Sequence, residues 1–109
     1  MDRDELLQAV RAQKFTENNG RVLKMVNILR YSYIGLEVIK DSALSDLSEN
    51  EFLDSVNFLQ KAGYISLRRI EGHEESTLAD SAYTELEGIV TEKGIRLIGL
   101  EIRDKSVRL

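Results

Sequence analysis

The feature that most constrains the fold is a change in hydrophobic period at Gly63. Before it, Phe52, Val56 and Leu59 recur at spacings of four and three residues, the period of an amphipathic helix. After it, apolar and polar side chains alternate between Tyr64 and Ile70, the period of a half-buried strand. A glycine suits this boundary because it takes the left-handed conformation that ends many helices. The chain therefore passes from helix to sheet at this point.

The start of the helix is marked by Ser48 and Glu51. The serine hydroxyl can accept a hydrogen bond from the third helical amide, and the glutamate can accept one from the serine amide, which together form a capping box. We therefore expect a helix over residues 48–62. Its apolar face is expected to pack against Leu29 and Ile98.

Three further helices are expected before this one, over residues 4–14, 21–33 and 36–43. The residues Glu17-Asn18-Asn19-Gly20 are expected to break the chain between the first two helices. The second helix has a core stripe at helical spacing, made of Val22, Met25, Val26, Leu29 and Tyr33.

The remainder of the chain is expected to form a hairpin and a closing helix. The polar residues 71–76 separate the first strand from a second β-like run over residues 82–90, so the two are expected to pair as a long-looped hairpin. Thr91 can cap a last helix that runs from Glu92 to about Arg103. Its apolar face is expected to consist of Ile95, Ile98 and Ile102, with Leu97 beside it.

Composition limits the function classes that this chain can belong to. The 109 residues, 42% hydrophobic and 31% charged, suit a single globular domain over residues 1–109. Without cysteine, the chain has no disulfide, no thiolate nucleophile and no Cys-containing metal site. Its seven glycines form no phosphate loop or dinucleotide fingerprint, so we expect no enzyme and no cofactor. No apolar run approaches the roughly 20 residues that a membrane helix needs, and no signal-peptide pattern is present, so we expect a cytoplasmic protein that does not bind membranes.

Two short stretches of the sequence, together with the order of the expected elements, resemble a known family. Residues 58–65, Phe-Leu-Gln-Lys-Ala-Gly-Tyr-Ile, and residues 89–94, Ile-Val-Thr-Glu-Lys-Gly, resemble stretches of MarR-like and PadR-like regulators. Residues 30–36 also resemble a segment of small winged-helix proteins from Mu-like prophages. The resemblance implies an α+β winged helix-turn-helix fold, with its core over residues 21–102 and residues 1–14 as a flanking helix.

A winged helix-turn-helix fold implies that the third helix of its core enters the major groove and that the hairpin touches phosphate. The outward stripe of residues 48–62 holds Asn50, Asp54, Asn57 and Lys61. Asn57 could bond an adenine edge, Asp54 could accept from a cytosine amine, and Lys61 could hold a guanine or a phosphate. Arg68 on the first hairpin strand would reach a phosphate.

Two functions remain open because charge and resemblance disagree. The resemblance favours a DNA-binding protein, a small bacterial or prophage transcriptional regulator that contacts double-stranded DNA. However, residues 48–62 have three acidic side chains against one lysine, and Glu71, Glu74 and Glu75 follow at the hairpin tip. Acidic surfaces repel phosphate. The alternative is therefore a winged-helix module that binds another protein and not DNA.

The apolar stripe of residues 4–14, made of Leu6, Leu7 and Val10, must be buried against the chain's own core or against a partner. Flanking helices usually build the dimer in regulators of the resembled class, so we expect a homodimer. Packing on the chain's own core remains the alternative.

Overall fold

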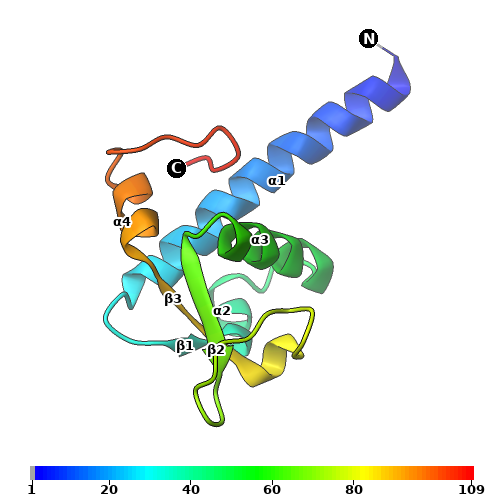
Figure 1. Cartoon of the computed structure of the whole chain (residues 1–109). Helices are drawn as coiled ribbons and strands as arrows, with labels where there is room; N and C mark the ends of the chain where they lie inside the picture. Colours follow the sequence, from blue (N-terminus) through cyan, green and yellow to red (C-terminus); the bar gives the residue numbers. More distant parts are fainter. Residues whose placement is uncertain (1) are drawn as a thin grey trace.

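A computed structural model describes residues 2–109 as an α+β fold (Figure 1). The described residues form four α-helices, a three-stranded antiparallel sheet and one short 3₁₀ turn. In chain order the elements are α1 (Arg3–Ile28), β1 (Ile34–Gly35), α2 (Leu36–Ala43), α3 (Glu49–Lys61), β2 (Ile65–Arg69), η1 (Tyr83–Glu85), β3 (Leu86–Val90) and α4 (Glu92–Ile98).

The sheet has the order β1-β3-β2, with each neighbouring pair antiparallel. The expected hairpin is confirmed, since β2 pairs with β3 from Ile65 opposite Val90 to Arg69 opposite Leu86. Strand β1 adds two residues on the other side of β3. The sequence did not predict β1, because two residues are too few to show a period.

The core lies between α1, α3 and the inner face of the sheet. Phe52, Val56 and Leu59 are fully buried, as their spacing predicted. The expected packing of these residues against Leu29 is wrong, because Leu29 follows the end of α1 and is 50% exposed. Ile98 is partly buried against the core.

The expected break at residues 17–20 is also wrong, because α1 continues through them as one helix. Gly20 faces the C-terminal segment of the chain, where a Cβ atom would lie only 1.8 Å from the carbonyl oxygen of Arg108. The Arg108 amide donates to the Thr16 carbonyl at 3.1 Å, and the Asn19 side chain donates to the Ser106 carbonyl at 2.9 Å. Gly20 is therefore a packing position inside a helix.

The first three turns of α1 project from the body of the molecule, and the chain spans 50 Å in its longest dimension (Figure 1). Every residue from Asp2 to Lys14 is exposed. The exposed fraction is 55% for Leu6 and 44% for both Leu7 and Val10. This apolar stripe therefore does not pack on the chain's own core.

The two predicted boundaries of α3 are confirmed. The Ser48 hydroxyl accepts from the Glu51 amide at 3.1 Å, and the Ser48 amide donates to the Glu51 carboxylate at 3.0 Å. The hydrogen bond from the Ser48 amide lowers the pKa of the Glu51 carboxyl. At the other end, Gly63 takes a left-handed conformation with φ of 86°.

Helix α4 is shorter than its sequence pattern suggested. Thr91 caps it as expected, since its hydroxyl accepts from the Gly94 amide at 3.1 Å. The helix ends at Ile98, well before Arg103, and its buried residues are Gly94 and Leu97. The expected inward face is wrong at Ile95, which is 44% exposed, whereas Ile98 and Ile102 are partly buried against the core.

Beyond α4, the chain turns and runs back to α1. Leu100 has a positive φ of 63°, which reverses the chain direction after the helix. Val107 is buried in the core, and the Tyr64 hydroxyl donates to Asp104 at 2.6 Å. Across residues 2–109, no helix has the length and apolar character needed to cross a membrane.

Candidate interaction face

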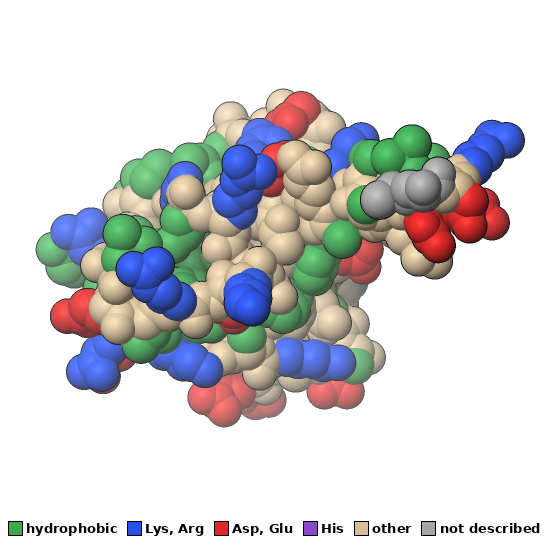
Figure 2. Space-filling model, turned by 90° about the horizontal axis from the view of Figure 1, so that it is seen from above, with side chains coloured by type: hydrophobic (Ala, Val, Ile, Leu, Met, Phe, Trp, Pro, Cys, Tyr) green, Lys and Arg blue, Asp and Glu red, His purple; other side chains and the backbone are tan. Residues whose placement is uncertain are grey.

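Charge is divided unequally between two parts of the molecule. Residues 49–87, which span α3, the hairpin and its long connection, contain nine acidic and three basic residues, a net charge of −6. The remaining residues contain twelve basic and ten acidic side chains, a net charge of +2. Figure 2 views the end of the molecule away from the hairpin tip, where Lys and Arg side chains are spread over the body. We call residues 49–87 the acidic half.

The outward stripe of α3 is accessible, as its spacing predicted. Asn50, Asp54 and Lys61 are exposed, and Asn57 is half-buried. Asp54, Asn57 and Lys61 line one hollow of about 500 Å³ between α1 and α3. Asn50 does not line it. The other residues that line this hollow are Phe15, Phe58 and Ala62.

The apolar floor of this hollow comes from a contact between helices. The rings of Phe15 and Phe58 meet edge to face, with their centroids 5.5 Å apart. An apolar floor rimmed by a carboxylate, an amide and an ammonium group suits an inserted side chain of a protein. A nucleic-acid backbone offers phosphates and sugars, which gain little from such a floor.

The charge of Arg68 is already compensated within the sheet. Its Nε donates to the Glu87 carboxylate at 2.9 Å, across the β2–β3 pair. Its guanidinium carbon lies 3.5 Å from the centroid of the Tyr33 ring, and the side chain is only 25% exposed. A contact between Arg68 and phosphate stays a prediction, but it would have to compete with these two partners.

Arg69 lies on the same face of β2 as Ile65 and Leu67, because the side chains of a strand alternate between its two faces. Its guanidinium donates to the Ser81 hydroxyl at 3.2 Å and lies 3.9 Å from the Glu85 carboxylate. Sequence reasoning missed Glu85 and Glu87 as partners of the two hairpin arginines. The register of the hairpin places Glu87 opposite Arg68. Glu85 is the last residue of η1, just before β3, and only the folded structure brings it close to Arg69.

The pKa of Tyr83, a residue beside α3, is raised by burial and by nearby carboxylates. Burial raises the pKa of the Tyr83 phenol, and the carboxylates of Glu49, Glu37 and Asp41 raise it further. Tyr83 also packs edge to face on Phe52, with ring centroids 6.1 Å apart. Carboxylates of both α2 and α3 therefore lie near η1, the short turn that contains Tyr83.

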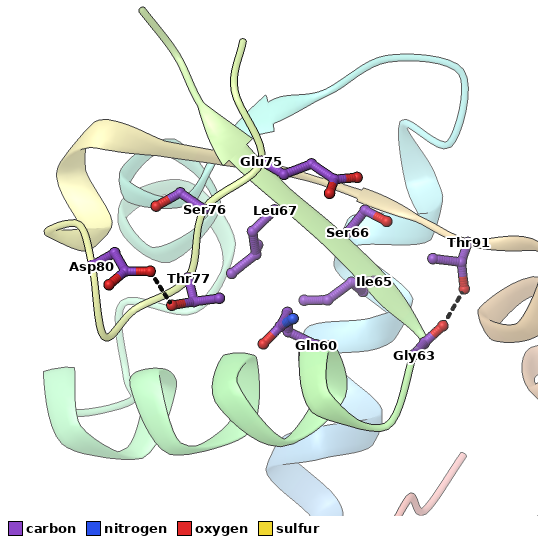
Figure 3. Close-up of a pocket in the computed structure, with 10 residues that line it drawn as sticks. All are labelled: Gln60, Gly63, Ile65, Ser66, Leu67, Glu75, Ser76, Thr77, Asp80 and Thr91. Carbon is purple, nitrogen blue, oxygen red and sulfur yellow. Dashed lines mark hydrogen bonds between the residues drawn. The ribbon is translucent and has the colours of Figure 1, made fainter.

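A cleft of about 340 Å³ lies between the end of α3, strand β2 and the segment that follows the hairpin tip (Figure 3). Two of its side chains are carboxylates, and none is Lys, Arg or His. The Thr91 hydroxyl donates to the Gly63 carbonyl at 2.6 Å, and the Thr77 hydroxyl donates to Asp80 at 3.4 Å. The lining residues are Gln60, Gly63, Ile65, Ser66, Leu67, Glu75, Ser76, Thr77, Asp80 and Thr91.

The lining of this cleft is rich in hydrogen-bond acceptors and contains no basic side chain, a composition that complements cationic groups. Its carboxylates, hydroxyls and amide can accept hydrogen bonds, but no lysine or histidine stands beside the hydroxyls to act as a base. Within residues 2–109, no three His, Asp or Glu side chains gather as metal ligands would.

Comparison of this chain with protein-family models, with curated proteins and with solved structures found no match.

Proposed function

We propose that this protein is a winged helix-turn-helix module that uses its acidic half to bind another protein. The order of elements supports the winged-helix part of the proposal. A short helix, α2, precedes the capped helix α3, a hairpin follows, and β1 pairs with the far side of β3. Apart from β1, which was not expected, this order agrees with the short helix, capped helix and hairpin that the resemblance of residues 21–102 implies.

The observation that carries the choice of partner is the net charge of −6 on the acidic half. In a winged helix-turn-helix protein that binds DNA, α3 and the hairpin would lie against phosphates. Of the three basic residues there, Arg68 and Arg69 are held beside Glu87 and Glu85, which leaves only Lys61 without an ion pair. Like charges oppose association, so this half favours a basic protein surface over a duplex.

Photocrosslinking in the cells that produce the protein tests the proposal. A benzophenone amino acid is placed at Asp54 on α3 or at Glu75 in the cleft, and a matched control is placed at the exposed Lys24 on α1. We expect positions 54 and 75 to crosslink to the same protein, with nuclease-resistant adducts, and position 24 not to do so. Adducts from position 54 that nuclease shortens would contradict the proposal.

DNA binding is a second candidate, and the accessible α3 stripe favours it. Asn57 and Lys61 lie on an open face of a capped helix, where a base edge could reach them. On this reading Lys61→Ala lowers the slope of log affinity against log salt by about one unit, because one phosphate contact is lost. Asn57→Ala costs about 1–3 kcal/mol at a preferred sequence and little elsewhere. A duplex affinity that neither variant changes would contradict this second candidate.

A further inference from the structure

Strand β2 lies at the edge of the sheet, and part of its outer edge has no partner. The Thr91 amide donates to the Tyr64 carbonyl and the Ile70 amide donates to the Glu85 carbonyl. Antiparallel strands alternate hydrogen-bonded and non-hydrogen-bonded pairs, so even-numbered residues of β2 bond to β3. The amide and carbonyl groups of Ile65, Leu67 and Arg69 therefore point away from β3, along the outer edge.

The chain covers one end of this edge with its own backbone. The Arg69 amide donates to the Glu74 carbonyl at 2.8 Å, and the Ser76 amide donates to the Leu67 carbonyl at 3.4 Å. The chain then turns away, because the amides of Asp80 and Ser81 both donate to the Thr77 carbonyl. Within residues 2–109, no backbone group pairs with Ile65 on this edge.

The uncovered end of the edge opens into the cleft. Ile65, Ser66 and Leu67 form one wall, and the turn from Thr77 to Asp80 lies opposite (Figure 3). The cleft therefore begins where the chain's own edge segment ends. An extended segment of another chain could continue the pairing from that point.

The charge of the cleft indicates which extended segment would fit. Glu75 and Asp80 line it without any basic side chain, and the acidic half surrounds it. A backbone bonded to Ile65 would bring its neighbouring side chains toward these carboxylates. Lysine and arginine are the side chains that would complement them.

We propose that the cleft binds an extended basic segment of a partner protein, which adds as a short strand to β2 at Ile65. Its Lys or Arg side chains pair with Glu75 and Asp80. This inference rests on the proposed function and specifies the partner segment that the acidic half recognises.

Titration of the ¹⁵N-labelled full chain with a synthetic acetylated peptide, Val-Lys-Val-Arg-Val-Thr, tests the inference. We expect saturable amide shifts at Ile65 and Leu67, and we expect none with a peptide that has Glu in place of Lys and Arg. A third peptide has the basic sequence with N-methylated backbone amides, and we expect it to bind more weakly because it cannot pair with a strand edge. Shifts confined to other parts of the chain, or no shifts, overturn the inference.

Two variants separate the cleft from general attraction to negative charge. Glu75→Gln is expected to weaken binding of the basic peptide by about twofold to fivefold, the range of a partly exposed ion pair. Glu71→Gln removes the same charge from the exposed hairpin turn outside the cleft, and it is expected to leave the affinity unchanged. Equal losses in both variants, with equal binding of the N-methylated peptide, overturn the strand pairing and leave the acidic half as a binding surface. Duplex binding by the chain would instead overturn the proposed function.

Discussion

Gly20 occupies a helical position at which any side chain would collide with the C-terminal segment. Alanine is the better helix former by about 1 kcal/mol, so local propensity alone predicts that Gly20→Ala stabilises α1. The contact with the Arg108 carbonyl predicts the opposite, because the segment that carries the buried Val107 must move away. We expect a lower melting temperature and faster hydrogen exchange at the Val107 amide.

A matched control is Gly99→Ala at the end of α4, where the nearest atom to the added Cβ lies 3.4 Å away and φ is negative. This variant is expected to change the melting temperature little. A higher melting temperature for Gly20→Ala would show that the C-terminal segment does not rest on α1.

Tyr64 gives the fold a dependence on alkaline pH. Burial, with its hydrogen bond to Asp104, raises the pKa of the phenol from 10.0 to about 12. The folded state thus holds this proton more tightly than the unfolded state, so the contribution to stability is complete below pH 10 and is lost as pH rises toward 12. Urea unfolding of the wild type and of Tyr64→Phe checks this. We expect the variant to lose less stability than the wild type over that interval, and equal losses would contradict the assignment.

Among the elements, those with local sequence signals were predicted well. The capping box, the left-handed Gly63 and the switch of period fixed α3 and β2 to within about one residue. Thr91 marked the start of α4 in the same way. Each of these signals depends on residues within four positions of one another, so it can be recognised in a single sequence without knowledge of the fold.

The errors concern contacts between distant segments. Gly20 was predicted to break a helix. The Arg108 backbone, whose close approach requires a glycine there, lies near the other end of the chain and so leaves no local signal. The pairing of Arg68 with Glu87 depends on the register of two strands, and β1 exists only because β3 is beside it. The site residues on α3 could therefore be placed from sequence, but the neutralised hairpin arginine and the cleft could not.

The projecting part of α1 gives a prediction about assembly. An isolated helix of this length is marginal in water, yet Leu6, Leu7 and Val10 lie exposed along it. We propose that a second copy covers this stripe, so deletion of residues 1–14 should convert a dimer to a monomer in sedimentation velocity. Leu7→Glu in the full chain should have the same effect, and Gln8→Glu, which lies off the stripe, should have little. A full-length protein that stays monomeric at high concentration would contradict the proposal.

At the scale of the whole molecule, charge separates the hairpin end from the rest. The acidic half carries a net charge of −6 and the remaining residues +2, so α3 and the hairpin have the same sign of charge as DNA. Electrostatic repulsion of this kind is strongest at low ionic strength, because salt screens it over about 10 Å at 0.1 M. Low salt is also the condition in which phosphate contacts would strengthen binding most.

The proposed preference for a protein partner is tested most directly by fluorescence anisotropy of a labelled mixed-sequence duplex, titrated with the full chain at low salt. We expect no binding by the wild-type chain. The triple variant Glu71→Lys, Glu74→Lys and Glu75→Lys should gain salt-sensitive affinity because it reverses the charge of the hairpin tip. Saturable binding of the duplex by the wild-type chain, weakened by Lys61→Ala and by added salt, would contradict the assignment of the acidic half to a protein partner.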